Sequence, residues 1–360
     1  MAAAVFSGGC SPLSAFPGLP PWVLLPGRAH GRNRAGLGRS RGPPGHSEPE
    51  RDRVLKLDAM VAPLRADVVS GASVISRTAA DVVRRAVNRI PATDVGEFRE
   101  MLATLVLKIL EAQPAMAPLV AMASAVLEAA GEDGELHAAR ERVLYALTRF
   151  REGLDAAAEQ VVDQAGGLLS HDARVLTLSF SSTVAATLTR FGPEKSIRVT
   201  CLESRPMSEG QRLARQLAGA GLRVTYAVDA AAASLVRGAD LGFMGADSLG
   251  DRGIVNKVGS LPLALAAREA DVPVHVLLDR TKLLPPGFPQ TLADDRPEEE
   301  VWKSPHGIRV WNRYFEIIPL ELTADIVTEE GPLPRDAIQA LRSSIPVPSE
   351  LREWAAARIS

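Results

Sequence analysis

The chain has 360 residues, more than one typical hydrophobic core requires, so we expect two domains with additional segments. Hydrophobic residues make up 46% and charged residues 23% of the sequence, a composition typical of a globular protein. A formal net charge of −2 provides no overall positive field, which argues against nucleic-acid binding.

Residues 1–53 are predicted to form a disordered extension. Proline, glycine and arginine are abundant in it, and no acidic residue precedes Glu48. Such a segment buries too little apolar surface to offset the entropy of ordering it. An arginine-rich, acid-poor N-terminus is also typical of organelle transit peptides. A start codon assigned too early is an equally compatible interpretation, with Met60 as an internal candidate.

Residues 54–169 have the spacing of helices. Apolar side chains recur at intervals of four, three and four at Phe98, Leu102, Leu105 and Ile109, and again between residues 143 and 154. We expect an all-helical N-terminal domain of four or five helices.

Short apolar strands alternate with helices from Arg174 onwards. The predicted strands are residues 174–180, 196–202, 223–228, 241–244 and 274–278. This alternation indicates βαβ units and a parallel sheet. The predicted fold class is therefore α/β, with a helical N-terminal domain followed by a Rossmann-like parallel sheet domain. We assign the sheet domain to residues 170–345 and a C-terminal tail to residues 346–360.

Polar residues follow the predicted strands, where ligands bind in open parallel sheets. A single polar residue at a strand end is compatible with a simple helix cap, but four sets on one edge favour an anion site. These residues are Ser179, Ser181 and Ser182 at the end of the first strand, Glu203 and Arg205 after the second, Asp247 after the fourth, and Lys282 after the fifth.

Two of these positions allow alternative interpretations. Asp247 follows the small pair Gly245-Ala246, which would let the backbone approach a ligand, but it is also compatible with a cap of the next turn. Asn256 and Lys257 are predicted to open a helix after a glycine-rich loop, either as a phosphate site or as an ordinary solvated helix start. The nucleotide motifs G-x-G-x-x-G and G-x-x-x-x-G-K-[ST] are missing, so we expect no cofactor.

Cysteine and histidine usage favours neither a disulfide framework nor a metal site. The two cysteines, Cys10 and Cys201, lie in regions of different character, and the six histidines lack metal-ligand spacing. This usage fits a reducing cytoplasm. No apolar stretch approaches the ~20 residues that span a bilayer, so we predict no membrane partner.

Several motifs in order resemble the alpha, beta and delta subunits of translation initiation factor 2B. The same family includes methylthioribose-1-phosphate isomerase and ribose-1,5-bisphosphate isomerase. The resemblance covers residues 54 to 340. Its motifs are Ser70-Gly71-Ala72, Glu203-Ser204-Arg205-Pro206 with Glu209-Gly210, Gly245-Ala246-Asp247, Asn256-Lys257, Asn312 with Phe315-Glu316, and Thr328-Glu329-Glu330-Gly331.

The resemblance implies a homodimer or larger homo-oligomer and a small phosphorylated metabolite as the ligand. It places the catalytic pair of the isomerases at Asp247 and Ser179. The ligand-binding set that we predict is Gly71, Ala72, Gln113, Ser181, Ser182, Glu203, Arg205, Asn256, Lys257 and Lys282.

Three departures from the isomerase pattern bear on activity. Ser70 and Gln113 stand where the isomerases have phosphate-contacting arginines, and Ser179 stands at the catalytic cysteine. A serine hydroxyl is far less acidic than a thiol with a pKa near ~8.5. Each lost arginine removes charge-assisted hydrogen bonds of about 1.5–3 kcal/mol, which weakens tight bisphosphate binding.

The leading hypothesis is an initiation factor 2B-like protein that binds a sugar phosphate or nucleotide monophosphate and is regulatory or weakly catalytic. One alternative is an active aldose–ketose isomerase that uses Asp247 with Ser179 or a water molecule. Cys201, on the neighbouring strand, is a less suitable substitute because it precedes the sheet edge. Another alternative is a structural subunit with a vestigial cleft.

Overall fold

The computed structural model of the chain describes residues 48–68, 70–292 and 296–358. Residues 1–47 of the predicted disordered extension therefore lie outside the described residues. Its last residues begin helix α1 (Glu48–Ala66). None of the described helices has the length and apolar character that crossing a membrane requires.

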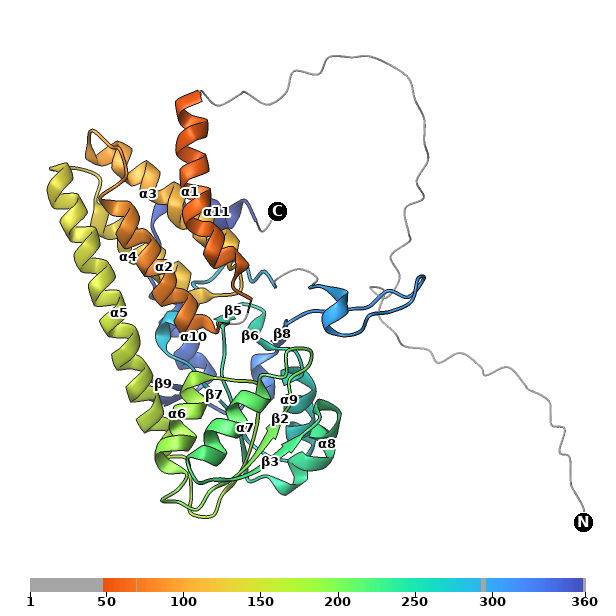
Figure 1. Cartoon of the computed structure of the whole chain (residues 1–360). Helices are drawn as coiled ribbons and strands as arrows, with labels where there is room; N and C mark the ends of the chain where they lie inside the picture. Colours follow the sequence, from red (N-terminus) through yellow and green to blue (C-terminus); the bar gives the residue numbers. More distant parts are fainter. Residues whose placement is uncertain (1–47, 69, 293–295, 359–360) are drawn as a thin grey trace, which may run out of the picture. The chain divides into compact units, whose positions relative to one another are not determined.

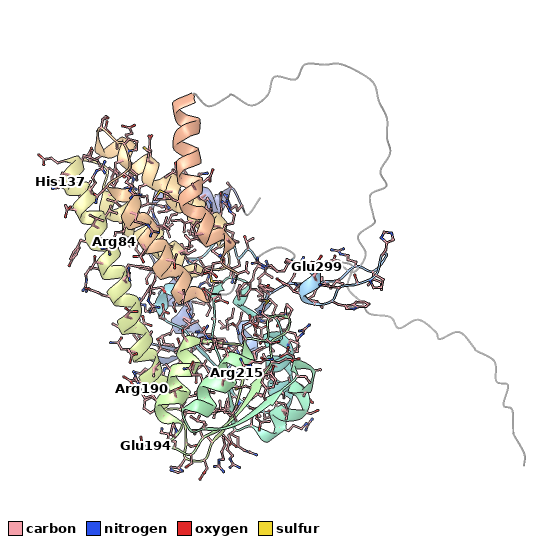
Figure 2. All side chains as sticks on the ribbon, in the orientation of Figure 1. Arg84, His137, Arg190, Glu194, Arg215 and Glu299 are labelled. Carbon is pink, nitrogen blue, oxygen red and sulfur yellow. The ribbon has the colours of Figure 1, made fainter. Side chains whose placement is uncertain are left out.

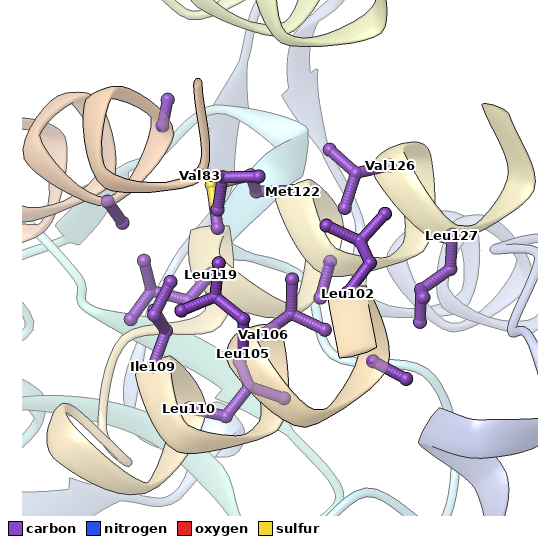
Figure 3. Packing of buried hydrophobic residues seen from close by; sticks show 14 of the residues in the cluster. Val83, Leu102, Leu105, Val106, Ile109, Leu110, Leu119, Met122, Val126 and Leu127 are labelled. Atoms are coloured by element: carbon purple, nitrogen blue, oxygen red, sulfur yellow. The ribbon is translucent and has the colours of Figure 1, made fainter. Parts of the chain in front are cut away.

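Helix α1 is followed by α2 (Ala72–Val87), α3 (Val95–Ala112), α4 (Ala117–Ala130) and α5 (Leu136–Gly166). The predicted apolar face of α3 is buried against α2 and α4 (Figure 3). Asp94 caps α3 by accepting a hydrogen bond from the backbone N–H of Glu97 at 2.9 Å, which fixes where this helix begins.

Seven strands form the main sheet in the order β10-β9-β7-β4-β1-β2-β3. All neighbours are parallel except β10 and β9, so the predicted Rossmann-like architecture is confirmed. The five predicted strands agree with the structure to within two residues at each end. They are β1 (Arg174–Leu178), β2 (Arg198–Leu202), β3 (Arg223–Ala227), β4 (Leu241–Met244) and β7 (Val274–Leu277), whereas β9 (Ile326–Thr328) and β10 (Gly331–Leu333) were not predicted from the sequence.

Helices connect the strands of this sheet. Helix α6 (Ser182–Phe191) follows β1, α7 (Gly210–Gly219) follows β2, the short α8 (Ala232–Leu235) follows β3, and α9 (Ser260–Glu269) precedes β7. The chain runs outward from β1 to β3 and then crosses back to β4 on the other side of β1. This reversal is the topological switch point, where open α/β sheets bind ligands.

The predicted helix start at Asn256 and Lys257 is wrong. These residues end strand β6 (Gly253–Lys257), which pairs antiparallel with β5 (Ser248–Gly250) and β8 (Phe315–Ile318) in a separate three-stranded sheet. The side chains of Ile254 and Val255, which pair with β5 and β8, are fully buried. Tertiary packing therefore decides the secondary structure of this segment, and helix propensity does not. Helix α9 begins three residues later, at Ser260.

Helix α5 contributes to two of the three hydrophobic cores of the described residues. Its first half packs through Ala139, Val143 and Leu147 into the helical core, and its second half packs through Val161 and Ala165 beside the sheet. The long helix is visible in Figure 1 running from the other helices to the strands. At its far end, Arg190 of α6, labelled in Figure 2, donates to Asp163 of α5 at 2.8 Å.

The last described helices are α10 (Arg335–Ser343) and α11 (Ser349–Ala356). Helix α11 lies in the segment predicted as a C-terminal tail. Its residues Leu351 and Ala355 are buried in the core of the N-terminal helices. Arg99 of α3 donates from Nε to Glu350 at 2.6 Å, so the chain end contributes to a core formed by its beginning.

Candidate functional site

A cavity of about 430 Å³ lies at the switch point of the sheet. Residues that follow β1 and β4 form one wall, and the start of α2 forms another. The last residues of β6 and the first residue of β8 close the cavity. Ligand sites in proteins are typically concave pockets of this size with a few convergent polar groups. A larger hollow of about 530 Å³ between α4 and α5 is lined mainly by apolar atoms and has no such convergence.

The loop after β1 brings three serines to the cavity. Ser179 adopts a left-handed conformation with φ of 62°, which is unfavourable for a residue with a Cβ atom. Ser181 caps α6 by accepting from the N–H of Val184 at 3.4 Å. Ser182 begins α6, whose first N–H groups have no partner inside the helix.

A second helix N-terminus faces the same cavity. Helix α2 starts at Ala72, and its N-cap residue, Gly71, has no side chain to occupy the first N–H groups. Gly71, Ala72 and Ser73 all line the cavity. Two helix N-termini therefore present free N–H groups and positive dipole ends to one space, an arrangement that favours an anion.

Backbone hydrogen bonds hold Asp247 in place at the cavity wall. Its N–H donates to Val255 at 2.9 Å and its carbonyl accepts from Ala117 at the start of α4 at 3.2 Å. No described residue donates a hydrogen bond to the carboxylate, so the alternative of a turn cap has no support. Desolvation raises the pKa of Asp247 to about 6, against the opposing effect of Lys282 and Lys257. A carboxyl group with this pKa can accept and release a proton near neutral pH.

The two cavity lysines differ in their partners. Lys257 is only 5% exposed, forms an ion pair with Glu209, and lies 4.4 Å from the ring centre of Tyr314. Lys282, 6% exposed, has no ion pair or side-chain hydrogen bond with any residue in the described part of the chain. Of the two ammonium groups, that of Lys282 is therefore the more available for contact with a ligand.

Among the cavity residues that were not assigned to the site from the sequence, three have charged or phenolic side chains: Glu209, Arg212 and Tyr314. Glu209 was noticed only as part of a motif, although its pairing with Lys257 places it in the wall. Arg212, one turn further along α7, stacks its guanidinium 3.8 Å from the ring centre of Phe180. Tyr314 donates its hydroxyl proton to Glu300 at 2.7 Å, and burial raises the pKa of this phenol.

Most of the predicted site residues lie together, since the cavity is lined by Gly71, Ala72, Ser179, Ser181, Ser182, Asp247, Asn256, Lys257 and Lys282. The side chain of Asn256 also donates to Ser260 at 2.9 Å and so shapes the turn before α9.

Gln113, Glu203 and Arg205 are not among the lining residues. Gln113 donates to the carbonyls of Leu64 and Asp67 at 2.6 and 2.8 Å, which anchors the end of α1. Arg205 points its guanidinium to the carbonyl of Val301 at 3.2 Å.

Cys201 does not reach the cavity. It is fully buried in β2, and desolvation raises the pKa of its thiol to about 12. The thiol therefore stays protonated and is unsuited to replace a catalytic cysteine. Within the described residues, no group of three or more histidine, cysteine, aspartate or glutamate side chains is placed to hold a metal ion.

A family model identifies the class of protein to which this fold belongs. Residues 68–335 match the model of the Initiation factor 2 subunit family, and the chain belongs to that family. The resemblance read from the sequence motifs is thereby confirmed.

Named relatives and solved structures agree with this assignment. The chain is 28% identical over 281 residues to ribose 1,5-bisphosphate isomerase of Thermococcus kodakarensis, covering 74% of this chain and 87% of the relative. It is 28% identical to methylthioribose-1-phosphate isomerase of Geobacillus kaustophilus, covering 73% and 80%. The crystal structure of Pyrococcus horikoshii translation initiation factor eIF-2B has the same fold, with a TM-score of 0.68 at 24% identity over 80% of this chain and 99% of that one.

Proposed function

We propose that the cavity binds a sugar phosphate or nucleotide monophosphate and that the protein is regulatory or weakly catalytic. The observation that carries the proposal is that two helix N-termini and Lys282 converge on the carboxylate of Asp247. Neither side chain has a hydrogen-bond partner in the described part of the chain. The named isomerase relatives act on sugar phosphates, which supports the same class of ligand here.

The phosphate is proposed to lie against the N-termini of α2 and α6, where backbone N–H groups supply hydrogen bonds. Lys282 adds a positive charge from the short 3₁₀ turn Arg280–Lys282, which follows β7. The remaining polar part of the ligand would then lie near Asp247, whose carboxylate has no other partner among the described residues.

We propose a limited catalytic capacity because Ser179 occupies the position of the catalytic cysteine. Moving hydrogen between adjacent carbons of a sugar requires paired acid and base groups. Asp247 is suited to one role, but no histidine or carboxylate of the described residues is hydrogen-bonded to the hydroxyl of Ser179. An unactivated hydroxyl is a poor acid–base partner.

Calorimetry with the full chain and ribose 5-phosphate tests the proposal. Lys282→Ala should lower the affinity about 10- to 100-fold, because it removes a charge-assisted contact of about 1.5–3 kcal/mol. Lys303→Ala, an exposed lysine outside the cavity, should bind like the wild type. No binding at millimolar ligand would contradict the proposal and favour a vestigial cleft. An unchanged affinity in Lys282→Ala would contradict the proposed placement of the phosphate beside this lysine.

An active isomerase is the second candidate, and the raised pKa of Asp247 favours it. Incubation with ribose 1,5-bisphosphate and with methylthioribose 1-phosphate, followed by detection of the ketose, measures this activity. Turnover by the wild type that is lost in Asp247→Asn would establish the isomerase, whereas binding without turnover supports the regulatory function.

We further propose a cytoplasmic homodimer or larger homo-oligomer, with a role in translation initiation as one setting of the regulatory function. Tyr145 on α5 is 68% exposed beside the apolar hollow between α4 and α5, which supports self-association. Light scattering of the purified chain measures the oligomeric state, and a monomer at micromolar concentration would contradict it.

A further inference from the structure

We infer that Glu209 determines ligand specificity: it accepts a free hydroxyl of the ligand and rejects a second phosphate. The inference rests on the proposed function, because it concerns the same cavity. It narrows the ligand to a hydroxyl-bearing compound with one phosphate group.

Glu209 is held at the cavity wall by the start of α7. Gly210 is the next residue and lies so close to the end of β2 that a Cβ atom there would be 1.9 Å from the carbonyl oxygen of Leu202. The N–H of Gly210 also donates to the carbonyl of Glu203 at 3.1 Å. This tight contact, together with the ion pair to Lys257, fixes the carboxylate beside the ligand space.

The two carboxylate oxygens of Glu209 have different environments. One accepts from Lys257, while Oε2 is buried and has no hydrogen-bond partner among the described residues. A buried acceptor without a donor is costly, so the site gains when a ligand supplies one. A sugar hydroxyl is such a donor, whereas a phosphate dianion has only acceptor oxygens to offer.

The charges around the cavity limit how much negative charge it accepts. Three basic side chains, Arg212, Lys257 and Lys282, and two acidic ones, Glu209 and Asp247, leave a formal charge of +1 when both carboxylates are ionised. One phosphate monoester brings a charge of about −1.5 to −2 at neutral pH. A second phosphate would roughly double that charge next to the carboxylate of Glu209, where like charges repel.

Calorimetry of the full chain with ribose 5-phosphate, ribose 1-phosphate and ribose 1,5-bisphosphate tests the inference. The wild type should bind the better of the two monophosphates at least about tenfold more tightly than the bisphosphate. Glu209→Gln keeps an acceptor oxygen and removes the charge, so it should lose this preference while still binding the monophosphate. Glu209→Leu should also lose it and, in addition, weaken monophosphate binding because no acceptor remains.

Glu269→Gln provides the matched control, because it removes the same charge from an exposed position at the end of α9, outside the cavity. It should retain the wild-type preference. Thermal unfolding of each variant reports whether the loss of the Lys257 partner has disrupted folding.

The wild-type measurement can overturn the inference even if the Glu209 variants are unstable. Equal or tighter binding of the bisphosphate by the wild type would overturn the role of Glu209 and leave the proposed function intact. An unchanged preference in a folded Glu209→Gln protein would do the same. Failure of the wild type to bind any of the three ligands would instead overturn the proposed function, and the inference with it.

Discussion

Asp247 couples the stability of the protein to pH. Its pKa in the folded chain is about 6, above the ordinary value of 3.8, because burial penalises its charged form. Between these two values the folded protein holds a proton that the unfolded chain has already lost. The free energy of unfolding therefore falls as the pH rises from about 4 to about 6, and the full cost is present above that window.

Asp247→Asn should remove this cost. Two pKa units correspond to roughly 3 kcal/mol as an upper value, so the variant should be more stable than the wild type by up to about 3 kcal/mol at pH 8 and by much less at pH 4.5. Urea unfolding at the two pH values measures the difference. Asp271→Asn, at an exposed turn before β7, is the control. A stabilisation that is equal at both pH values would show that the carboxylate is not desolvated.

At the scale of elements, the cavity depends on a close approach between β4 and α6. Gly245 comes directly after β4, and a Cβ atom at this position would lie 2.7 Å from the side-chain oxygen of Ser181. That contact distance excludes any side chain at residue 245 unless the start of α6 moves. The sequence shows that residue 245 is a glycine, but it does not show that the start of α6 packs against this residue.

Gly245→Ala should therefore displace the start of α6, destabilise the protein by about 1–3 kcal/mol, and weaken ligand binding. Chemical denaturation and calorimetry measure the two effects. Adding Ser181→Gly to the variant should restore part of the stability, because it removes the atoms that clash. Gly219→Ala at the end of α7 meets open space and should be neutral or slightly stabilising. Equal effects of the two alanine variants would contradict a tight β4–α6 contact.

At the scale of the whole molecule, the C-terminus completes the N-terminal helical core. Leu351 of α11 is fully buried among residues of the N-terminal helices, and Ser124 of α4 donates to the carbonyl of Pro346 at 2.9 Å. Two ends of the chain that are far apart in sequence thus share one hydrophobic core. The packing of the N-terminal helices consequently depends on α11, at the opposite end of the chain.

Leu351→Ala should cost about 2–5 kcal/mol of unfolding free energy, because it leaves a cavity in that shared core. Leu265→Ala, at a residue that is 43% exposed on α9, should change stability by no more than about 0.5 kcal/mol. Urea unfolding monitored by circular dichroism compares the two variants. A cost for Leu351→Ala as small as that of Leu265→Ala would mean that α11 does not pack on the helices in solution.

The sequence alone determined the elements whose signals are local. Helix α3 follows from the spacing of Phe98, Leu102 and Leu105, and strands β1 and β4 follow from short apolar runs between turn residues. It also placed Ser179 and Asp247 at strand ends, because parallel strands put those ends on one edge. The family motifs added Gly71 and Ala72, which no local pattern connects to the sheet.

Only the tertiary structure decided the relations between distant segments. The pairing of β6 with β8 overrode the helical expectation at Lys257, and the ion pair across 48 residues brought Glu209 into the site. Arg205 and Gln113 were equally polar in the sequence, yet their partners are backbone carbonyls elsewhere in the fold. The physical reason is that hydrogen bonds, ion pairs and desolvation depend on which atoms meet in space, and a one-dimensional pattern specifies periodicity but not partners.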